Sequence, residues 1–333
     1  MKISMIFGCV IGVLAMMVII PTSVQARRTS TIRDHNFSRT LSGVVDEVRD
    51  AIYTYSPDVF SLIKLVADYS RDNQPISQNF AKELRSAFGE RTINEHIANF
   101  GYSVILNRPL LAMITTSHYA KHTLQRSDPW NGHVYLVSGI PLTVPHMVSE
   151  ITPTSESMSS FPRNTMRDQM FNLYFSSEST SSSNVSGVLG LLDEFSAYAF
   201  DTILLIDLYY FVVGYYENNG FTSFVRDYIY MSSAMQKQMD VFFLATLHHL
   251  IWLEQNRPGE FSWVMANTEY RRAFSYYVDR RNKLLAIQNE KMSNPYSSLP
   301  ARVVHLPEYR ENLDRFLQRR DVQEMLARVL VDY

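Results

Sequence analysis

The sequence is poor in cysteine. Its single cysteine, Cys9, lies in an apolar N-terminal stretch, and no other position of the 333 residues carries a thiol. If that stretch is removed on export, the mature chain holds no cysteine. Structural disulfides, thiol catalysis and thiolate metal sites are then excluded.

An excess of either charge is also missing. The chain has 31 Lys and Arg residues against 33 Asp and Glu residues. Nucleic-acid binding needs clustered basic side chains that neutralise phosphates, so we expect no nucleic-acid partner. A GxSxG nucleophile motif and a glycine-rich phosphate loop are absent as well, which removes two common local signatures of catalysis.

Glycine and proline are scarce relative to large apolar residues. The chain has 12 Gly and 13 Pro, against 20 Tyr, 19 Phe and 15 Met. A sandwich or barrel of many short strands needs more turns than this composition supplies. We predict a mainly α fold, a multi-helical globular domain around a long buried central helix with a small antiparallel β insertion.

The first 26 residues have the layout of a secretory signal peptide. Met1-Lys2 is a positive start, Ile3 to Ile20 is a run of apolar and small residues, and the pattern at Val24 and Ala26 suits cleavage after Ala26. We therefore expect a periplasmic or secreted protein, with residues 27–333 forming one compact, mostly helical domain. The alternative is an uncleaved membrane anchor, because the run is close to the shortest length that spans a bilayer.

The stretch from Val188 to Tyr216 predicts the central helix. Its charged residues are all acidic, and they are Asp193, Glu194, Asp201 and Asp207. Aspartates near the middle of an apolar stretch argue against a lipid-spanning helix. Glu194 and Asp201 are seven residues apart and share one helix face, while Asp193 and Asp207 lie on a neighbouring face.

Apolar periodicity and turn residues predict the other elements. The predicted helices cover about 41–55, 58–66, 77–88, 92–100, 164–175, 222–255, 269–292, 308–319 and 322–331. The β region, about 102–138, has predicted strands at 102–106, 110–116 and 133–137, and residues 139–145 are extended or turning. The serine-rich run 176–186 has almost no apolar content, so we expect a mobile loop that limited proteolysis cuts first.

The acids of the central helix have two interpretations, because a buried carboxylate is costly unless it is paired, hydrogen-bonded or bound to a metal. In the first, cations on neighbouring helices neutralise them, the candidates being Arg226, Arg271, Arg272 and Lys237. In the second, the acids belong to a metal or acid–base site.

Gly190 to Tyr198, GLLDEFSAY, resembles the helix that supplies the glutamate zinc ligand in gluzincin metallopeptidases. In that family an HExxH helix precedes this glutamate, and the matching stretch here is Pro145 to Pro153, PHMVSEITP. Ser149 and the final proline stand where the two histidines are expected, so only Glu150 and Glu194 match. The resemblance implies a degenerate member that has lost the usual zinc site, with Glu150 and Glu194 as the catalytic candidates.

A divalent metal could still bind in another geometry. His146 and Glu150 are four residues apart and would face one ion if Pro145 begins a helical turn. Together with Glu194 and Asp201 they are the candidate metal ligands.

Two further histidine pairs are present. His118 and His122 are either a second chelating pair or two unrelated exposed residues. In the apolar run around His248-His249, adjacent side chains point about 100° apart. We expect one of these two to be a hydrogen-bonded core residue and the other to lie at the edge of the core.

Two functional hypotheses follow. The first is an exported protein with a peptidase-like scaffold, whose cleft is formed around Glu150 and Glu194 and whose activity is lost or altered. The second is a non-enzymatic helical binding or scaffold protein of the cell envelope, with a peptide or an envelope protein as its partner.

Export can be tested directly. Val24 and Ala26 stand at the two positions that a signal peptidase reads before its cut. We therefore expect mass spectrometry of the protein made in its own host to show Arg27 at the amino terminus. Intact Met1 on membrane-bound material would instead support the anchor.

Overall fold

The computed structural model describes Ser56, Val59 and residues 132–138, 140–147, 151–161, 168–209, 222–292 and 307–333. The predicted signal peptide and Glu150 lie outside these ranges, as do the elements predicted between residues 41 and 131 apart from Ser56 and Val59. Within them the chain is mainly helical with a two-stranded antiparallel sheet, which confirms the predicted fold class. None of the helices in these ranges combines the length and apolarity needed to cross a bilayer.

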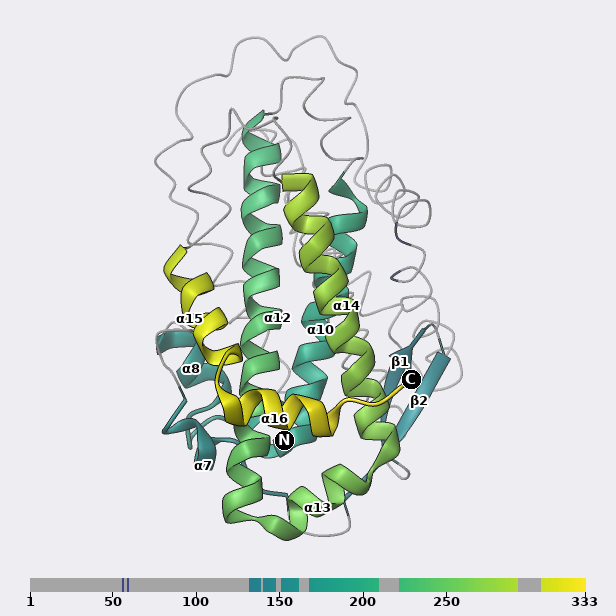
Figure 1. Cartoon of the computed structure of the whole chain (residues 1–333). Helices are drawn as coiled ribbons and strands as arrows, with labels where there is room; N and C mark the ends of the chain where they lie inside the picture. Colours follow the sequence, from purple (N-terminus) through teal and green to yellow (C-terminus); the bar gives the residue numbers. More distant parts are fainter. Residues whose placement is uncertain are drawn as a thin grey trace, which may run out of the picture.

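Three long helices run side by side through the centre of the molecule (Figure 1). They are α10, Gly187–Asp207, α12, Thr222–Asn256, and α14, Thr268–Met292. α10 packs most extensively on α12, and it also contacts α14. The predicted bounds of α12 and α14 are confirmed to within one residue.

The start of α10 is fixed by glycine and by a buried carboxylate. Gly187 has a φ of 51°, and a Cβ there would come within 2.7 Å of the Thr152 carbonyl oxygen. The Thr152 backbone N–H donates to the Glu260 carboxylate at 3.1 and 3.3 Å. Glu260 lies on α13, Pro258–Ala266, a helix that the sequence did not predict. The segment before α7, Ser155–Met158, is thereby tied to α13.

The end of α10 differs from the prediction. Every residue from Gly187 to Ile206 is buried, as expected for a central helix. However, the helix ends at Asp207 and a turn follows at Leu208, so the predicted continuous helix is interrupted before Tyr216. Residues 210–216 are outside the described ranges.

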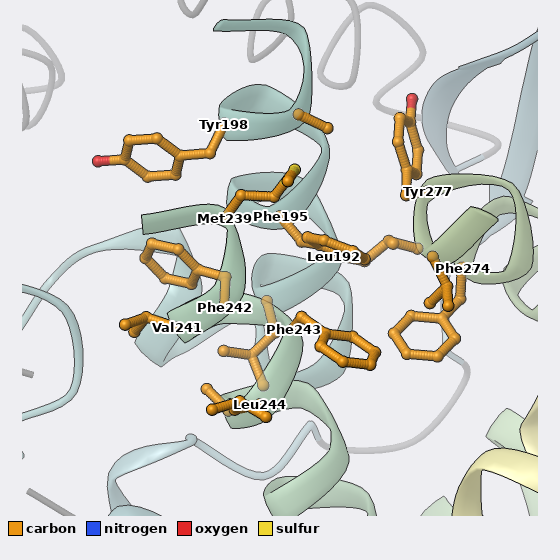
Figure 2. Packing of buried hydrophobic residues seen from close by; sticks show 14 of the residues in the cluster. Leu192, Phe195, Tyr198, Met239, Val241, Phe242, Phe243, Leu244, Phe274 and Tyr277 are labelled. Atoms are coloured by element: carbon orange, nitrogen blue, oxygen red, sulfur yellow. The ribbon is translucent and has the colours of Figure 1, made fainter. Parts of the chain in front are cut away.

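Aromatic side chains fill the space between the three helices (Figure 2). Phe195 of α10 lies 5.7 Å from Phe243 of α12 and 6.0 Å from Phe274 of α14, measured between ring centroids. Tyr198 stacks on Phe242 at 5.4 Å. Offset and edge-on ring pairs of this kind stabilise a core beyond the area they bury.

The sheet lies beside α14 (Figure 1). Strand β1, Gly132–Val137, pairs antiparallel with β2, Ile140–Pro145, with Tyr135 opposite Leu142. The predicted strand at 133–137 is confirmed, and its partner is the segment that was expected to be extended or turning. The other two predicted strands fall outside the described residues.

The serine-rich segment, residues 176–186, differs from the expected mobile loop. It folds into turns and the short helix α9, Ser182–Val185, and Ser179, Ser183 and Asn184 are buried. The hydroxyls of Ser181 and Ser183 donate to the Tyr174 carbonyl oxygen at 3.0 and 3.1 Å. That carbonyl ends α8, Asp168–Tyr174. Composition indicated no apolar packing here, but it could not indicate these tertiary hydrogen bonds.

The C-terminal helices lie against the bundle, with α16, Arg320–Val329, crossing its lower part above α13 (Figure 1). α15 spans Pro307–Leu317, and α16 contacts α12. Both predicted helices are confirmed. Arg328 of α16 donates from both terminal nitrogens to the Glu254 carboxylate of α12 at 2.6 Å, and Arg271 of α14 donates to the Arg328 carbonyl oxygen at 2.7 Å.

Gly190 should be indispensable for the packing of α9 on α10. A Cβ at this position would overlap the backbone carbonyl of Ser182, which cannot rotate away. We expect Gly190→Ala to lower the free energy of unfolding by about 3 kcal/mol in a urea titration.

Gly259→Ala is the matched control, because a Cβ at Gly259 meets nothing within 4 Å. This exposed position in the first turn of α13 should gain about 0.5 kcal/mol from alanine. Equal effects of the two substitutions would contradict the packing of α9 on α10.

Candidate functional site

The acidic residues predicted on the central helix are enclosed by protein. Asp193 is 2% exposed, and Glu194 and Asp201 are each 1% exposed. All three have interaction partners within the molecule. Asp207, at the end of α10, is half-buried and accepts a hydrogen bond from the Ser56 hydroxyl at 2.7 Å. The predicted acidic stripe therefore exists, but its first three members face the interior.

Asp193 lies beside a set of buried hydroxyl groups. The Ser182 hydroxyl donates to the Asp193 carboxylate at 3.3 Å. Burial, followed by the Asp193 charge, raises the pKa of Tyr135 well above its ordinary value. Burial likewise raises the pKa of Tyr277. Both phenols therefore remain protonated donors at any physiological pH.

These two tyrosines join three elements. Tyr135 of β1 donates to the Leu189 carbonyl oxygen of α10 at 3.1 Å, and Tyr277 of α14 donates to the Leu136 carbonyl oxygen of β1 at 2.9 Å. Sequence reasoning singled out neither tyrosine and missed their polar role. Nothing in the local sequence identifies which buried tyrosine carries a hydrogen bond.

The buried cation in this region is Arg281 of α14. Its Nε donates to the Asp240 carboxylate of α12 at 2.6 Å, and the two side chains are 4% and 2% exposed. Gln236 donates to the same carboxylate oxygen at 3.3 Å, and the guanidinium lies 4.5 Å from the centroid of the Phe243 ring. Such a pair holds two helices in one register because separating the charges in a dry interior is costly.

Sequence reasoning proposed other cations for the buried acids. Arg271 is wrong in that role, because its guanidinium donates to the carbonyl oxygens of Arg328 and Val329 at the end of α16. Arg271 thus caps the C-terminus of a helix, where a positive charge is favourable. The assignment of Arg226, Arg272 or Lys237 to the acids stays a prediction.

The candidate metal ligands do not converge within the described residues. Pro145 is the last residue of β2, so the helical turn expected to begin there is wrong. His146 follows the strand, is exposed, and packs edge-on against His133 with ring centroids 5.3 Å apart. No group of three His, Cys, Asp or Glu side chains suited to a metal ion occurs in the described ranges, so His146, Glu194 and Asp201 do not form one. A set that includes Glu150 stays a prediction.

Two serine–histidine contacts form a cluster that the sequence only partly indicated. Ser157 Oγ lies 2.8 Å from His249 Nδ1, and Ser160 Oγ lies 3.2 Å from His248 Nε2. The serines belong to α7, Ser155–Met158, and to the turn after it, whereas the histidines lie on α12. Both histidines are buried and hydrogen-bonded, with His249 at 0% and His248 at 8% exposure, so the expected core histidine is present and the second one is less peripheral than predicted.

The proton positions in this cluster are unsuited to nucleophilic catalysis. When Ser157 Oγ donates to the Thr154 carbonyl oxygen at 2.9 Å, its proton is engaged there and His249 Nδ1 acts as the donor to Ser157. A general base would need the opposite arrangement, in which the imidazole accepts the serine proton. Ser157 and His249 are also fully buried. The contact is therefore a structural one.

Asn184 fastens the serine-rich segment to α7. Its amide nitrogen donates to the carbonyl oxygens of Ser176 and Ser179, and its amide oxygen accepts from the Ser155 backbone N–H at 2.9 Å. Thr154 donates its hydroxyl to the Ser183 carbonyl oxygen at 2.9 Å. A polar network thus runs from α8 through α9 to α7 and on to the histidines of α12.

Comparisons with protein-family models, with curated proteins and with solved structures gave no match for the chain.

The buried pair of Arg281 and Asp240 gives a quantitative test of this interior. Replacing Arg281 with Met leaves Asp240 charged and uncompensated among helices, so we expect a loss of about 3 to 5 kcal/mol in the free energy of unfolding. The double variant Arg281→Met, Asp240→Asn should recover a large part of that loss. Chemical denaturation of the two single variants and the double variant measures the coupling.

Arg320→Met is the control, because Arg320 pairs with Glu324 on the exposed face of α16. Solvent-exposed pairs contribute little, so its unfolding curve should almost coincide with that of wild type. Additive effects at positions 240 and 281 would show that the two charges do not interact in solution.

Proposed function

We propose that this protein is an exported, non-enzymatic helical binding or scaffold protein of the cell envelope, built on a peptidase-like helical scaffold. The observation that carries the proposal is the burial of the α10 carboxylates. Glu194, the residue that the resemblance would place at a zinc site, is 1% exposed in a helix that is buried from Gly187 to Ile206. A catalytic carboxylate must touch its substrate, and this one is enclosed by side chains.

The polar groups of the interior support a structural role for these acids. Asp240 is held by Arg281, and Asp193 accepts from Ser182. Glu194 and Asp201 also have partners within the molecule. Buried charges that are matched by internal donors specify how helices pack, whereas a reactive site needs groups left available for a ligand.

The partner class follows from charge and compartment. A chain without a basic excess has no electrostatic preference for nucleic acid, so the proposed partner is a peptide or another envelope protein. The competing function is a metal-dependent activity at His146, Glu150, Glu194 and Asp201. It is favoured by one observation, the placement of three nearly inaccessible acids on a single helix.

Thermal unfolding with and without a chelator separates the two functions. If the proposal is right, Glu194→Gln and Asp201→Asn each disturb a buried carboxylate that has a partner within the molecule, and each lowers the free energy of unfolding by about 2 to 4 kcal/mol. EDTA then leaves the wild-type melting temperature unchanged, and elemental analysis of the purified mature protein finds no stoichiometric transition metal.

Glu178→Gln is the matched control, since Glu178 is exposed in the serine-rich segment and should tolerate the change. A wild-type melting temperature that falls with EDTA, together with a Glu194→Gln variant at least as stable as wild type, would favour the metal-dependent function. A functional site holds like charges close together at the expense of stability. Removing one of these charges therefore raises the free energy of unfolding, whereas removing a structural carboxylate lowers it.

A further inference from the structure

The two adjacent histidines of α12 hold α7 through a single serine. His249 Nδ1 contacts the Ser157 hydroxyl at 2.8 Å, and His248 Nε2 contacts the Ser157 carbonyl oxygen at 3.0 Å. A carbonyl oxygen only accepts, so His248 must carry its proton on Nε2. Each imidazole thus donates one hydrogen bond to α7 from a defined nitrogen.

The opposite nitrogens of the two rings are buried and carry lone pairs. Among the described residues, no hydrogen-bond partner reaches His249 Nε2 or His248 Nδ1. His249 is covered on one side by Trp252, whose ring stacks on it with centroids 6.1 Å apart. Protonation at either nitrogen would therefore place a positive charge in the core with no acceptor beside it.

The charged groups near the pair do not offset that cost. Arg319, before α16, disfavours a charged His248, and Asp321 in the first turn of α16 favours it to a smaller extent. Each histidine also repels a charge on the other. Burial lowers the pKa of His248 and, with the neighbouring His248, lowers that of His249 to about 3.

We propose that His248 and His249 form an acid-sensitive clasp, in which protonation of His249 releases α7 from α12 while the three-helix core, with α9 packed on α10, stays folded. The release can be local because α7 has only four residues and its hydrogen bonds to α9 are confined to its N-terminal end, at Thr154 and Ser155. In the open form His249 is exposed to water, and its imidazole then accepts a proton with the ordinary pKa of 6.5.

The direction of the effect follows from proton binding. The open form binds the proton more tightly than the closed form, so opening becomes more favourable as pH falls from 6.5 toward 3. Above pH 6.5 both forms are neutral and the clasp is closed. For one group with these two pKa values, the opening equilibrium rises roughly 25-fold between pH 7 and pH 5.

Thiol labelling can detect this opening because the chain has a single natural cysteine. In the full chain carrying Cys9→Ser, a new thiol is introduced at one of two buried positions. Met158→Cys reports on α7 and Ala199→Cys reports on α10, and both native side chains are fully buried. The probe is 4,4′-dithiodipyridine, which reacts with thiols in weak acid, and each rate is divided by that of an unstructured cysteine peptide at the same pH.

The corrected rate at position 158 should rise roughly 25-fold from pH 7 to pH 5, whereas the rate at position 199 should stay within about a factor of three. His249→Asn should remove most of the rise at 158, because the asparagine amide can still donate to Ser157 but does not titrate. His146→Asn, at an exposed histidine outside the cluster, should leave the rise intact.

Equal acceleration at positions 158 and 199 would overturn the clasp, since it indicates global acid unfolding. A rise at 158 that persists in His249→Asn would overturn it as well, by assigning the opening to other groups. If His249→Asn does not fold, the comparison of the two thiols in the background with native histidines decides the question. A flat rate at 158 in that background rejects the clasp.

Discussion

The complete burial of α10 is the constraint on which the rest of the structure depends. A helix that is enclosed on every side has no solvent to satisfy its polar side chains, so each must find a partner within the protein, either on a neighbouring element or on the backbone of the helix itself. α12, α14 and α9 surround it. The same enclosure requires glycine at Gly190, where α9 crosses at backbone contact distance. The burial of α10 therefore restricts which residue types can occupy it and which partners their side chains contact.

The interior contains a few hydrogen-bonded polar side chains, and aromatic rings pack between them. Tyr135 and Tyr277 donate to carbonyl oxygens of other elements, and Arg281 with Asp240 joins α14 to α12. These contacts are directional, whereas stacked rings such as Tyr198 and Phe242 tolerate small shifts. Directional contacts therefore specify the register of the helices, and the rings contribute to the buried apolar area together with aliphatic side chains.

The candidate site was predictable only where a single helix determines it. Spacing along α10 placed Glu194 and Asp201 on one face, since helical geometry alone decides that relation. Pro145 was read as a helix start, but pairing with Gly132 makes it the end of β2. Ser157 could not be connected with His249 from the sequence, because the two residues are 92 positions apart. Contacts of that range arise from packing and leave no local pattern.

The sequence by itself determined the mainly helical class, the positions of α12, α14, α15 and α16, and the apolar character of α10, because periodicity and breaking residues act over a few turns. Only the tertiary structure decided that the serine-rich segment is packed, that Arg271 caps α16 and that Arg281 is buried with Asp240. In each of these cases the free energy of the group depends on a distant partner. The sequence gives the chemical type of each side chain, whereas the packing of the helices determines which partner that side chain contacts.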